Sequence, residues 1–166
     1  MALDIDIIIA DPRWEACGEA IEARLRAAAD AMASVTGFEG EACLLLTDAA
    51  RMQELNREWR GKDRPTDVLS FEAGPEARPY LGDIAIGHET ASRDAGEMGK
   101  PLTDHVAHLL VHGLLHLVGH THESEEDAAL MEGLERQALE KLGIPDPYFL
   151  QSGDDGPAEQ KNSDAI

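Results

Sequence analysis

Four segments of the chain show the apolar patterns of β-strands. The segment Leu3–Ile9 alternates apolar residues with aspartates, which is typical of a strand with one face on a core. Ala42–Thr47 is a short continuous apolar run, the pattern of a buried strand. Val68–Phe71 and Leu81–Ile86 predict two more strands. The segment between them, Glu72–Tyr80, contains a glycine and two prolines and is expected to be a loop.

Helices are predicted where apolar residues recur at helical spacing behind a capping residue. Asp11-Pro12, Asp48 and Ser124 are typical helix starts, and Gly37 and Gly119 are typical helix ends. The expected helices run from Trp14 to about Ser34, from Asp48 to Trp59, from Gly87 to Met98, from Pro101 to about Val118 and from Ser124 to about Leu142. This order predicts an α+β (mixed α/β) fold, with a small mixed four-stranded sheet packed with about five helices.

Composition favours one folded domain. With 166 residues, of which 43% are hydrophobic and 28% charged, we expect a single domain over residues 1–150 and a flexible acidic tail over 151–166.

The N-terminus lacks the basic and apolar regions of a signal peptide, and the run Val106–Val118 is too short to span a bilayer. Cys17 and Cys43 show no CxxC spacing and are expected to be reduced thiols. These features predict a cytoplasmic protein with no membrane partner.

The charge balance limits how the chain could bind nucleic acid. The sequence has 14 Lys and Arg against 33 Asp and Glu, for a net charge of −19. Such a chain cannot wrap a polyanion with its whole surface, so any contact has to be local. Four basic residues, Arg57, Arg60, Lys62 and Arg64, fall within eight positions. We expect this segment to form the positive lip of a cleft, where any contact with nucleic acid would be weak and salt-dependent.

Histidines provide the strongest chemical signal. Six of the seven lie between positions 105 and 122. His112 and His116 are four residues apart on a predicted helix, so their side chains leave it only about 40° apart, on one face and on successive turns. The rest of this helix is apolar around most of its circumference, and a metal ion would offset the cost of placing several imidazoles there. His105 and His108 are expected to form hydrogen bonds, either at the edge of the core or to the ligand residues from behind.

A third ligand is expected just beyond the end of the helix. Gly119 ends the helix, so the chain can turn back and bring His122 to the ion. His120 is the competing candidate and would require the helix to continue. Three histidines leave one coordination position open, as in catalytic zinc sites. Gly113 occupies the position where HExxH proteases carry their glutamate base, which disfavours a peptidase and favours close packing of another element on this helix.

Three blocks of sequence resemble the YbeY endoribonuclease (rRNA maturation factor) family. The segment His112–His122, HGLLHLVGHTH, resembles the family signature HGxLHLxGxDH. The segment Asn56–Phe71 resembles NxxxRxKDxPTDVLSF, and Leu81–Ile84 matches LGDI. The blocks fall in order across about Leu44–Gly143, and together they are highly specific. Thr121 departs from the pattern, because the family usually has Asp there, and this puts in question whether a carboxylate at that position orients a ligand histidine.

The resemblance implies a zinc-dependent endoribonuclease that is specific for single strands. It would act in rRNA maturation, at the 3′ end of the small-subunit rRNA, and in ribosome quality control. His112, His116 and His122 would hold one Zn²⁺ per chain, with Ni²⁺ or another divalent ion as alternatives. Arg60 would be catalytic, stabilising phosphate charge with its planar guanidinium. The expected partners are single-stranded or ribosomal RNA and the small ribosomal subunit with its proteins, and no DNA.

Two other functions remain open from the residues alone. One is a metal hydrolase of peptides or small molecules, and the other is a ribosome-assembly module whose metal is structural. A fully coordinated ion would favour the structural role, and bound water in a cleft would favour catalysis. Asp67 and Asp83 are expected to be structural residues at strand ends, so the general base is left unassigned.

Overall fold

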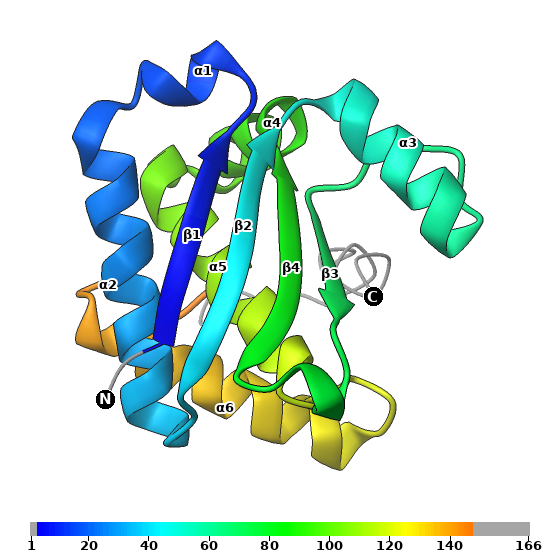
Figure 1. Ribbon diagram of the computed structural model, residues 1–166. Coiled ribbons are helices and arrows are strands. Elements are labelled where there is room, and N and C mark those ends of the chain that lie inside the picture. Colours follow the sequence, from blue (N-terminus) through cyan, green and yellow to red (C-terminus); the bar gives the residue numbers. More distant parts are fainter. Residues whose placement is uncertain (1–2, 148–166) are drawn as a thin grey trace.

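A computed structural model of the chain describes residues 3–147 and has a four-stranded mixed sheet at its centre (Figure 1). The sheet order is β1-β2-β4-β3. The neighbours β1, β2 and β4 are parallel, and β3 is antiparallel to β4. This confirms the predicted mixed sheet. The strands are β1 (Leu3–Ile9), β2 (Gly40–Thr47), β3 (Val68–Glu72) and β4 (Tyr80–Gly87).

Six α-helices accompany this sheet in residues 3–147, one more than the expected number of about five. They are α1 (Pro12–Glu15), α2 (Gly18–Thr36), α3 (Ala49–Arg60), α4 (His88–Met98), α5 (Leu102–Leu117) and α6 (Glu125–Lys141). A short 3-10 turn, η1 (Pro75–Ala77), lies within the expected loop. The capping residues Asp11, Asp48 and Ser124 each accept a hydrogen bond from a backbone N–H in the first turn of their helix, as predicted.

The extra helix arises because the expected helix from Trp14 to about Ser34 is divided. The first part, α1, ends at Glu15, and α2 starts only at Gly18. Trp14 is completely buried, and its indole N–H donates to the carbonyl of Thr47 at the end of β2 over 2.9 Å. This anchor holds α1 against the end of the sheet, whereas α2 runs along it. Helical periodicity alone does not reveal such a change of direction.

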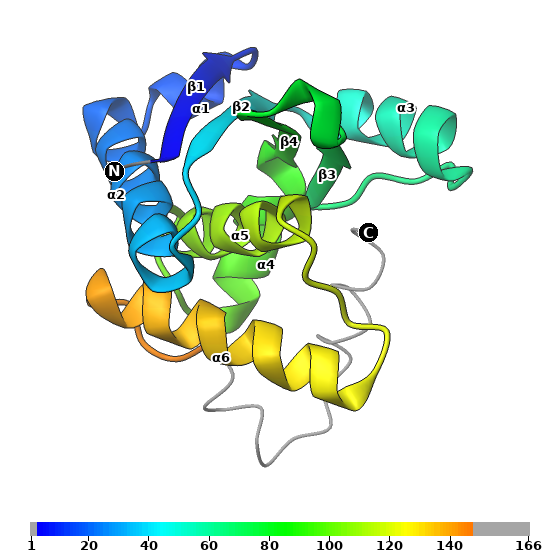
Figure 2. The same ribbon diagram turned by 60° about the horizontal axis from the view of Figure 1, so that its bottom comes forward.

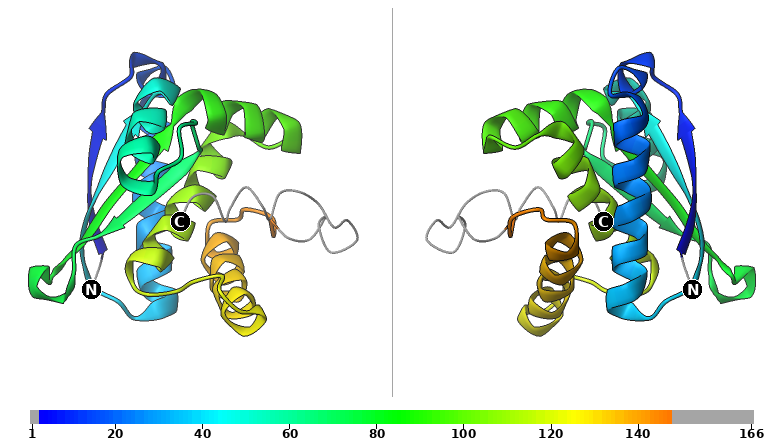
Figure 3. Two further views of the ribbon diagram at one scale, coloured as in Figure 1. Left: turned by 90° about the vertical axis from the view of Figure 1, so that its right-hand side faces the viewer. Right: turned by 90° about the vertical axis from the view of Figure 1, so that its left-hand side faces the viewer.

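The main core lies between one face of the sheet and the helices α2 and α5, with α6 packed across both (Figures 2 and 3). Helix α5 is buried from His105 to Leu117, which confirms the predicted buried central helix. Gly113 explains how α5 approaches the sheet so closely. A Cβ atom there would lie 3.1 to 3.3 Å from three side-chain carbons of Ile84 on β4.

The opposite face of the sheet is covered only in part. A smaller apolar cluster joins Met52 of α3 to Leu69 and Ala85 of the sheet, with Leu55 and Phe71 packed against it. Strand residues alternate between the two faces, so this cluster lies on the side away from α2 and α5. The part of this face beyond α3 borders the pocket described below.

The expectations about membrane spans and cysteines can be compared with the structure, whereas those about the C-terminal tail cannot. No helix within residues 3–147 is long and apolar enough to cross a membrane. Cys17 and Cys43 are separate free thiols, as predicted. The expected acidic tail, residues 151–166, and the end of the expected 1–150 domain lie outside the described residues.

Candidate metal centre and adjoining pocket

The last two turns of α5 bring His112 and His116 together. Both side chains are buried, with 2% and 6% of their surface exposed. Their Nε2 atoms lie 3.1 Å apart, and their rings meet nearly at right angles, with centroids 4.6 Å apart. The spacing of four residues therefore places the rings side by side, as the sequence predicts.

Beyond α5 the chain turns back and adds His122. Gly119 has φ +104°, in the left-handed region that glycine adopts without strain. The His122 ring then lies 4.9 Å from the His112 ring and 5.0 Å from the His116 ring. One potential ligand atom from each of the three histidines lies within 4.8 Å of the others. His120 contributes its backbone carbonyl, which accepts a hydrogen bond from Nδ1 of His116 over 2.8 Å.

Behind this group lies Glu135 of α6, a residue that the sequence analysis missed. Glu135 is fully buried, and its two carboxylate oxygens bind Nδ1 of His112 at 2.7 Å and Nε2 of His108 at 3.0 Å. Burial alone would raise the pKa of Glu135, but its interactions with His112 and His108 outweigh burial and hold the pKa well below its usual range. One signal was present: Glu135 interrupts the apolar face that Met131, Ala138 and Leu139 form on α6.

The hydrogen bonds of the rings leave ring nitrogens that could bind a cation. Nδ1 of His116 faces a carbonyl, which can only accept, and Nδ1 of His112 faces a carboxylate, so both Nδ1 atoms carry the proton. Burial, together with the neighbouring His112, lowers the pKa of His116 to about 3, so this ring is neutral at pH 7. A neutral ring with its proton on Nδ1 turns a lone pair outward at Nε2.

The ring positions fit a single ion. Two imidazole nitrogens that bind one tetrahedral zinc are about 3.3 Å apart, given bonds of about 2.0–2.1 Å, and the two Nε2 atoms are 3.1 Å apart. Nδ1 of His122 is shielded from solvent and has no hydrogen-bond partner within residues 3–147. Burial lowers the pKa of His122 as well. Two buried imidazoles, His112 and His116, and the half-buried imidazole of His122 form the donor set that zinc and nickel prefer.

Thr121, the departure from the family pattern, lies in the turn before α6. Its hydroxyl is 3.3 Å from a carboxylate oxygen of Asp127 and accepts a longer contact, 3.4 Å, from the backbone N–H of Glu123. These contacts hold the turn that carries His122. Within the described residues, the carboxylate that contacts a histidine of the group comes from Glu135.

Arg60, at the end of α3, reaches the outer edge of the sheet. Its Nη2 donates to the carbonyl of Ser70 on β3 over 2.6 Å, and its guanidinium carbon lies 5.0 Å from the centre of the Phe71 ring. The Nε atom is buried and has no hydrogen-bond acceptor in the part of the chain that the structure describes. The contacts of Nη2 and of the ring therefore hold the guanidinium in place.

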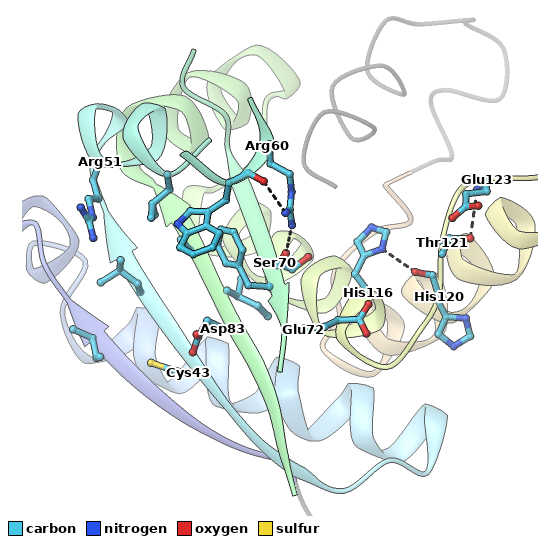
Figure 4. Close-up of a pocket in the computed structure, with 17 residues that line it drawn as sticks. Cys43, Arg51, Arg60, Ser70, Glu72, Asp83, His116, His120, Thr121 and Glu123 are labelled. Atoms are coloured by element: carbon cyan, nitrogen blue, oxygen red, sulfur yellow. Dashed lines mark hydrogen bonds between the residues drawn. The ribbon is translucent and has the colours of Figure 1, made fainter. Parts of the chain in front are cut away.

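A pocket of about 830 Å³ is lined both by Arg60 and by His116 of the histidine group (Figure 4). In this view Arg60 and Ser70 lie between the sheet residues Cys43 and Asp83 on one side and His116 on the other. Apolar residues of the strands and α3 line the part over the sheet, namely Ile8, Leu45, Leu55, Trp59, Phe71, Ile84 and Ala85.

The predicted positive lip is narrower than expected. Of its four basic residues, only Arg60 lines the pocket, where Arg51 of α3 joins it. Arg57 lies 3.6 Å from the carboxylate of Asp63 instead. Glu72, Asp83 and Glu123 also line the pocket, so its charge is mixed.

A second buried polar group lies deeper in the core. Asp67, Asp94 and His105 place potential ligand atoms within 4.8 Å of one another. Asp67 accepts a hydrogen bond from the backbone N–H of Val68 over 2.8 Å, which is the strand-end contact expected for it. Burial, with the nearby charge of Asp94, raises the pKa of Asp67. This group links the start of β3 to α4 and α5.

Comparison with known proteins agrees with the motifs. The family described as endoribonuclease YbeY matches residues 9–143. An endoribonuclease YbeY from Rhodopseudomonas palustris is 46% identical over 155 residues, covering 88% of this chain and 92% of the relative. Another endoribonuclease YbeY, from Methylocella silvestris, is 53% identical over 127 residues, covering 74% of this chain and 72% of the relative.

The fold also has a solved counterpart. A Thermotoga maritima protein whose structure was determined in solution superposes with a TM-score of 0.53 at 22% identity, covering 87% of this chain and 97% of that one. The extent and level of the sequence matches place the chain in the endoribonuclease YbeY family, as its three motif blocks predict.

Proposed function

We propose that this protein is a metal-dependent endoribonuclease that cuts single-stranded RNA during rRNA maturation. Membership in the endoribonuclease YbeY family supports the reaction class. The observation that carries the proposal is the convergence of His112, His116 and His122 beside a pocket that His116 lines together with Arg60. A cation site and a fixed guanidinium are what phosphoryl transfer requires, because negative charge builds up on the phosphate oxygens.

The three histidines would hold one Zn²⁺, or Ni²⁺ or another divalent ion. Such an ion would polarise a phosphoryl oxygen and make water a better nucleophile. The ligand roles of the chain's own residues are supported by their surroundings. Glu135 and the carbonyl of His120 fix the rings of His112 and His116 with Nε2 turned toward the shared site.

Arg60 would bind and orient the phosphate. Its Nη2 contact with Ser70 and its position over the Phe71 ring keep the guanidinium at the edge of β3. Its Nη1 makes only a long contact, 3.5 Å, with the carbonyl of Trp59, and a phosphate oxygen would be a stronger acceptor for it.

Cleavage of single-stranded RNA by the purified chain tests this function. We expect activity to follow metal content measured by elemental analysis. It should be lost in His116→Ala and reduced about 100-fold or more in Arg60→Ala, because a fixed donor on a developing charge contributes about that much. Gln137, exposed on α6, offers a control, since Gln137→Ala should leave activity unchanged. Cleavage that survives His116→Ala would contradict the assignment.

Two rival functions give different results in the same assay. A peptidase or small-molecule hydrolase would cut those substrates and spare RNA, but Gly113 stands where a HExxH protease needs glutamate. A structural metal in a ribosome-assembly module would bind tightly without any turnover. We further propose a cytoplasmic location, one domain over residues 1–150, and the small ribosomal subunit with its proteins as partners, with a role in ribosome quality control.

A further inference from the structure

Trp59 is unusually exposed for its size and lies beside the proposed cleavage site. It is 65% exposed, whereas Trp14 is fully buried. Four large apolar side chains within residues 3–147 are exposed, Ile8, Trp59, Met98 and Leu130, and two of them, Ile8 and Trp59, line the same pocket. Exposed apolar area that gathers at one site indicates a ligand-binding surface.

The surroundings of Trp59 hold the indole in place without covering it. Its ring meets Phe71 edge to face, with centroids 6.3 Å apart and planes at 67°. The Phe71 ring in turn lies 5.0 Å from the guanidinium carbon of Arg60. Trp59, Phe71 and Arg60 thus form a continuous aromatic and cationic row at the rim of the pocket.

The charges of the pocket indicate which part of an RNA would enter it. Glu72, Asp83 and Glu123 line it together with Arg51 and Arg60. Arg51 is already paired with Glu54. A run of phosphates would therefore face carboxylates, whereas an uncharged nucleobase would not. Carboxylates can also accept hydrogen bonds from the amino group of a base.

We propose that Trp59 is a stacking platform for a nucleobase of single-stranded RNA, next to the phosphate that Arg60 binds. The inference rests on the proposed endoribonuclease function and adds a base-binding subsite to it. Stacking on an exposed aromatic ring accepts any base and requires that the base be unpaired. The subsite thereby gives a physical reason for preferring single strands to duplexes.

Binding of short RNAs to the full-length chain tests this subsite. In the presence of a chelator, single-stranded RNA should bind Trp59→Ala about 10-fold or more weakly than the unaltered chain, because stacking contributes about 1–3 kcal/mol per base. Trp59→Phe should recover part of the loss. Since Trp14 is buried, binding should also quench the fluorescence of the exposed indole.

Three controls separate stacking from other effects. An abasic strand of equal length should bind the unaltered chain and Trp59→Ala equally, and an RNA duplex should show no dependence on Trp59. Leu130→Ala removes another exposed apolar side chain, on α6 and outside the pocket lining, and should change nothing. Equal RNA affinity in Trp59→Ala and the unaltered chain would overturn the subsite, even if RNA is cleaved, and would indicate a protein partner for the indole. A metal-loaded, unaltered chain that binds RNA through Trp59 but never cleaves it would overturn the endoribonuclease function instead.

Discussion

At the scale of single residues, Glu135 is the group outside the proposed ligand set that contacts it most closely, through His112. One carboxylate binds two imidazoles, and its burial leaves no water to replace it. Removing its charge while keeping its size therefore tests positioning alone. A glutamine there offers one amide oxygen and one NH₂ group, so it cannot accept from both His108 and His112.

We expect Glu135→Gln to weaken metal binding about 10- to 100-fold, the usual effect of losing a carboxylate behind a ligand histidine. Competition with a chromogenic chelator measures this affinity without using activity. Glu140→Gln, on the exposed side of the same helix, is the matched control and should bind metal normally. Unchanged affinity in both variants would mean that His112 does not need Glu135 to keep its orientation.

At the scale of the elements, the approach of α5 to β4 depends on Gly113. An alanine there gains up to about 1 kcal/mol of helix stability but places its Cβ against Ile84, and overpacking a core costs about 1–3 kcal/mol. Because Ile84 is 1% exposed in the central part of the sheet, it cannot move away easily.

We therefore expect Gly113→Ala to lower the free energy of unfolding by about 1 kcal/mol, and Ile84→Val to reduce that loss when the two are combined. Denaturant unfolding of the single and double variants measures the coupling. The control is Gly96→Ala on α4, where a Cβ meets nothing within 4 Å and should stabilise the protein slightly. Additive effects of Gly113→Ala and Ile84→Val would contradict the packing argument.

The start of α1 should contribute a pH-dependent part of the stability. The side chain of Asp11 accepts from the backbone N–H of Arg13 and pairs with its guanidinium, and these interactions lower the Asp11 pKa from 3.8 to about 2. A carboxyl whose pKa is lower in the folded state stabilises the fold above its unfolded pKa and loses that effect as the pH falls.

Asp11→Asn keeps a capping oxygen and removes the charge. We expect it to be less stable than the unaltered chain at pH 7, with the difference shrinking between about pH 4 and pH 2. Thermal unfolding followed across this pH range measures the difference. A difference in unfolding temperature between the two proteins that stays constant from pH 7 to pH 2 would exclude this role for the Asp11 charge.

Comparison of the helices and strands with the expected ones shows which features of the fold the sequence predicts. Local signals, such as apolar periodicity, Asp48 and Ser124 at helix starts, and Gly119 at a helix end, located every strand and nearly every helix. They also selected His122 over His120 as the residue that joins the histidine group. What they could not supply depends on contacts distant in sequence. Trp14 anchors α1 through Thr47, and Glu135 meets His112 across 23 positions. The pocket's mixed charge likewise depends on which residues the sheet brings together.

At the scale of the whole molecule, a net charge of −19 opposes the approach of RNA, so the affinity has to come from a few local contacts. Single strands give a salt slope of about −0.7 for each phosphate neutralised. If Arg57, Arg60, Lys62 and Arg64 each neutralise one phosphate, a plot of the logarithm of the RNA association constant against the logarithm of the salt concentration should have a slope no steeper than about −3. A chain that binds RNA through a broad surface would show a steeper slope.

Charge reversal separates the local contacts from the overall field. Lys62 and Arg64 do not line the pocket, so the phosphates that they would contact lie outside it. If they make these contacts, Lys62→Glu with Arg64→Glu should weaken RNA binding and make the salt slope shallower by about 1.4. Arg26→Glu with Arg136→Glu changes the net charge equally, but these residues lie on α2 and α6, away from the basic segment that follows α3. That control should weaken binding only through long-range repulsion, an effect that disappears at high salt because the Debye length shortens to about 3 Å at 1 M. Equal losses and equal slopes in the two double variants would show that net charge, rather than the basic segment, sets the affinity for RNA.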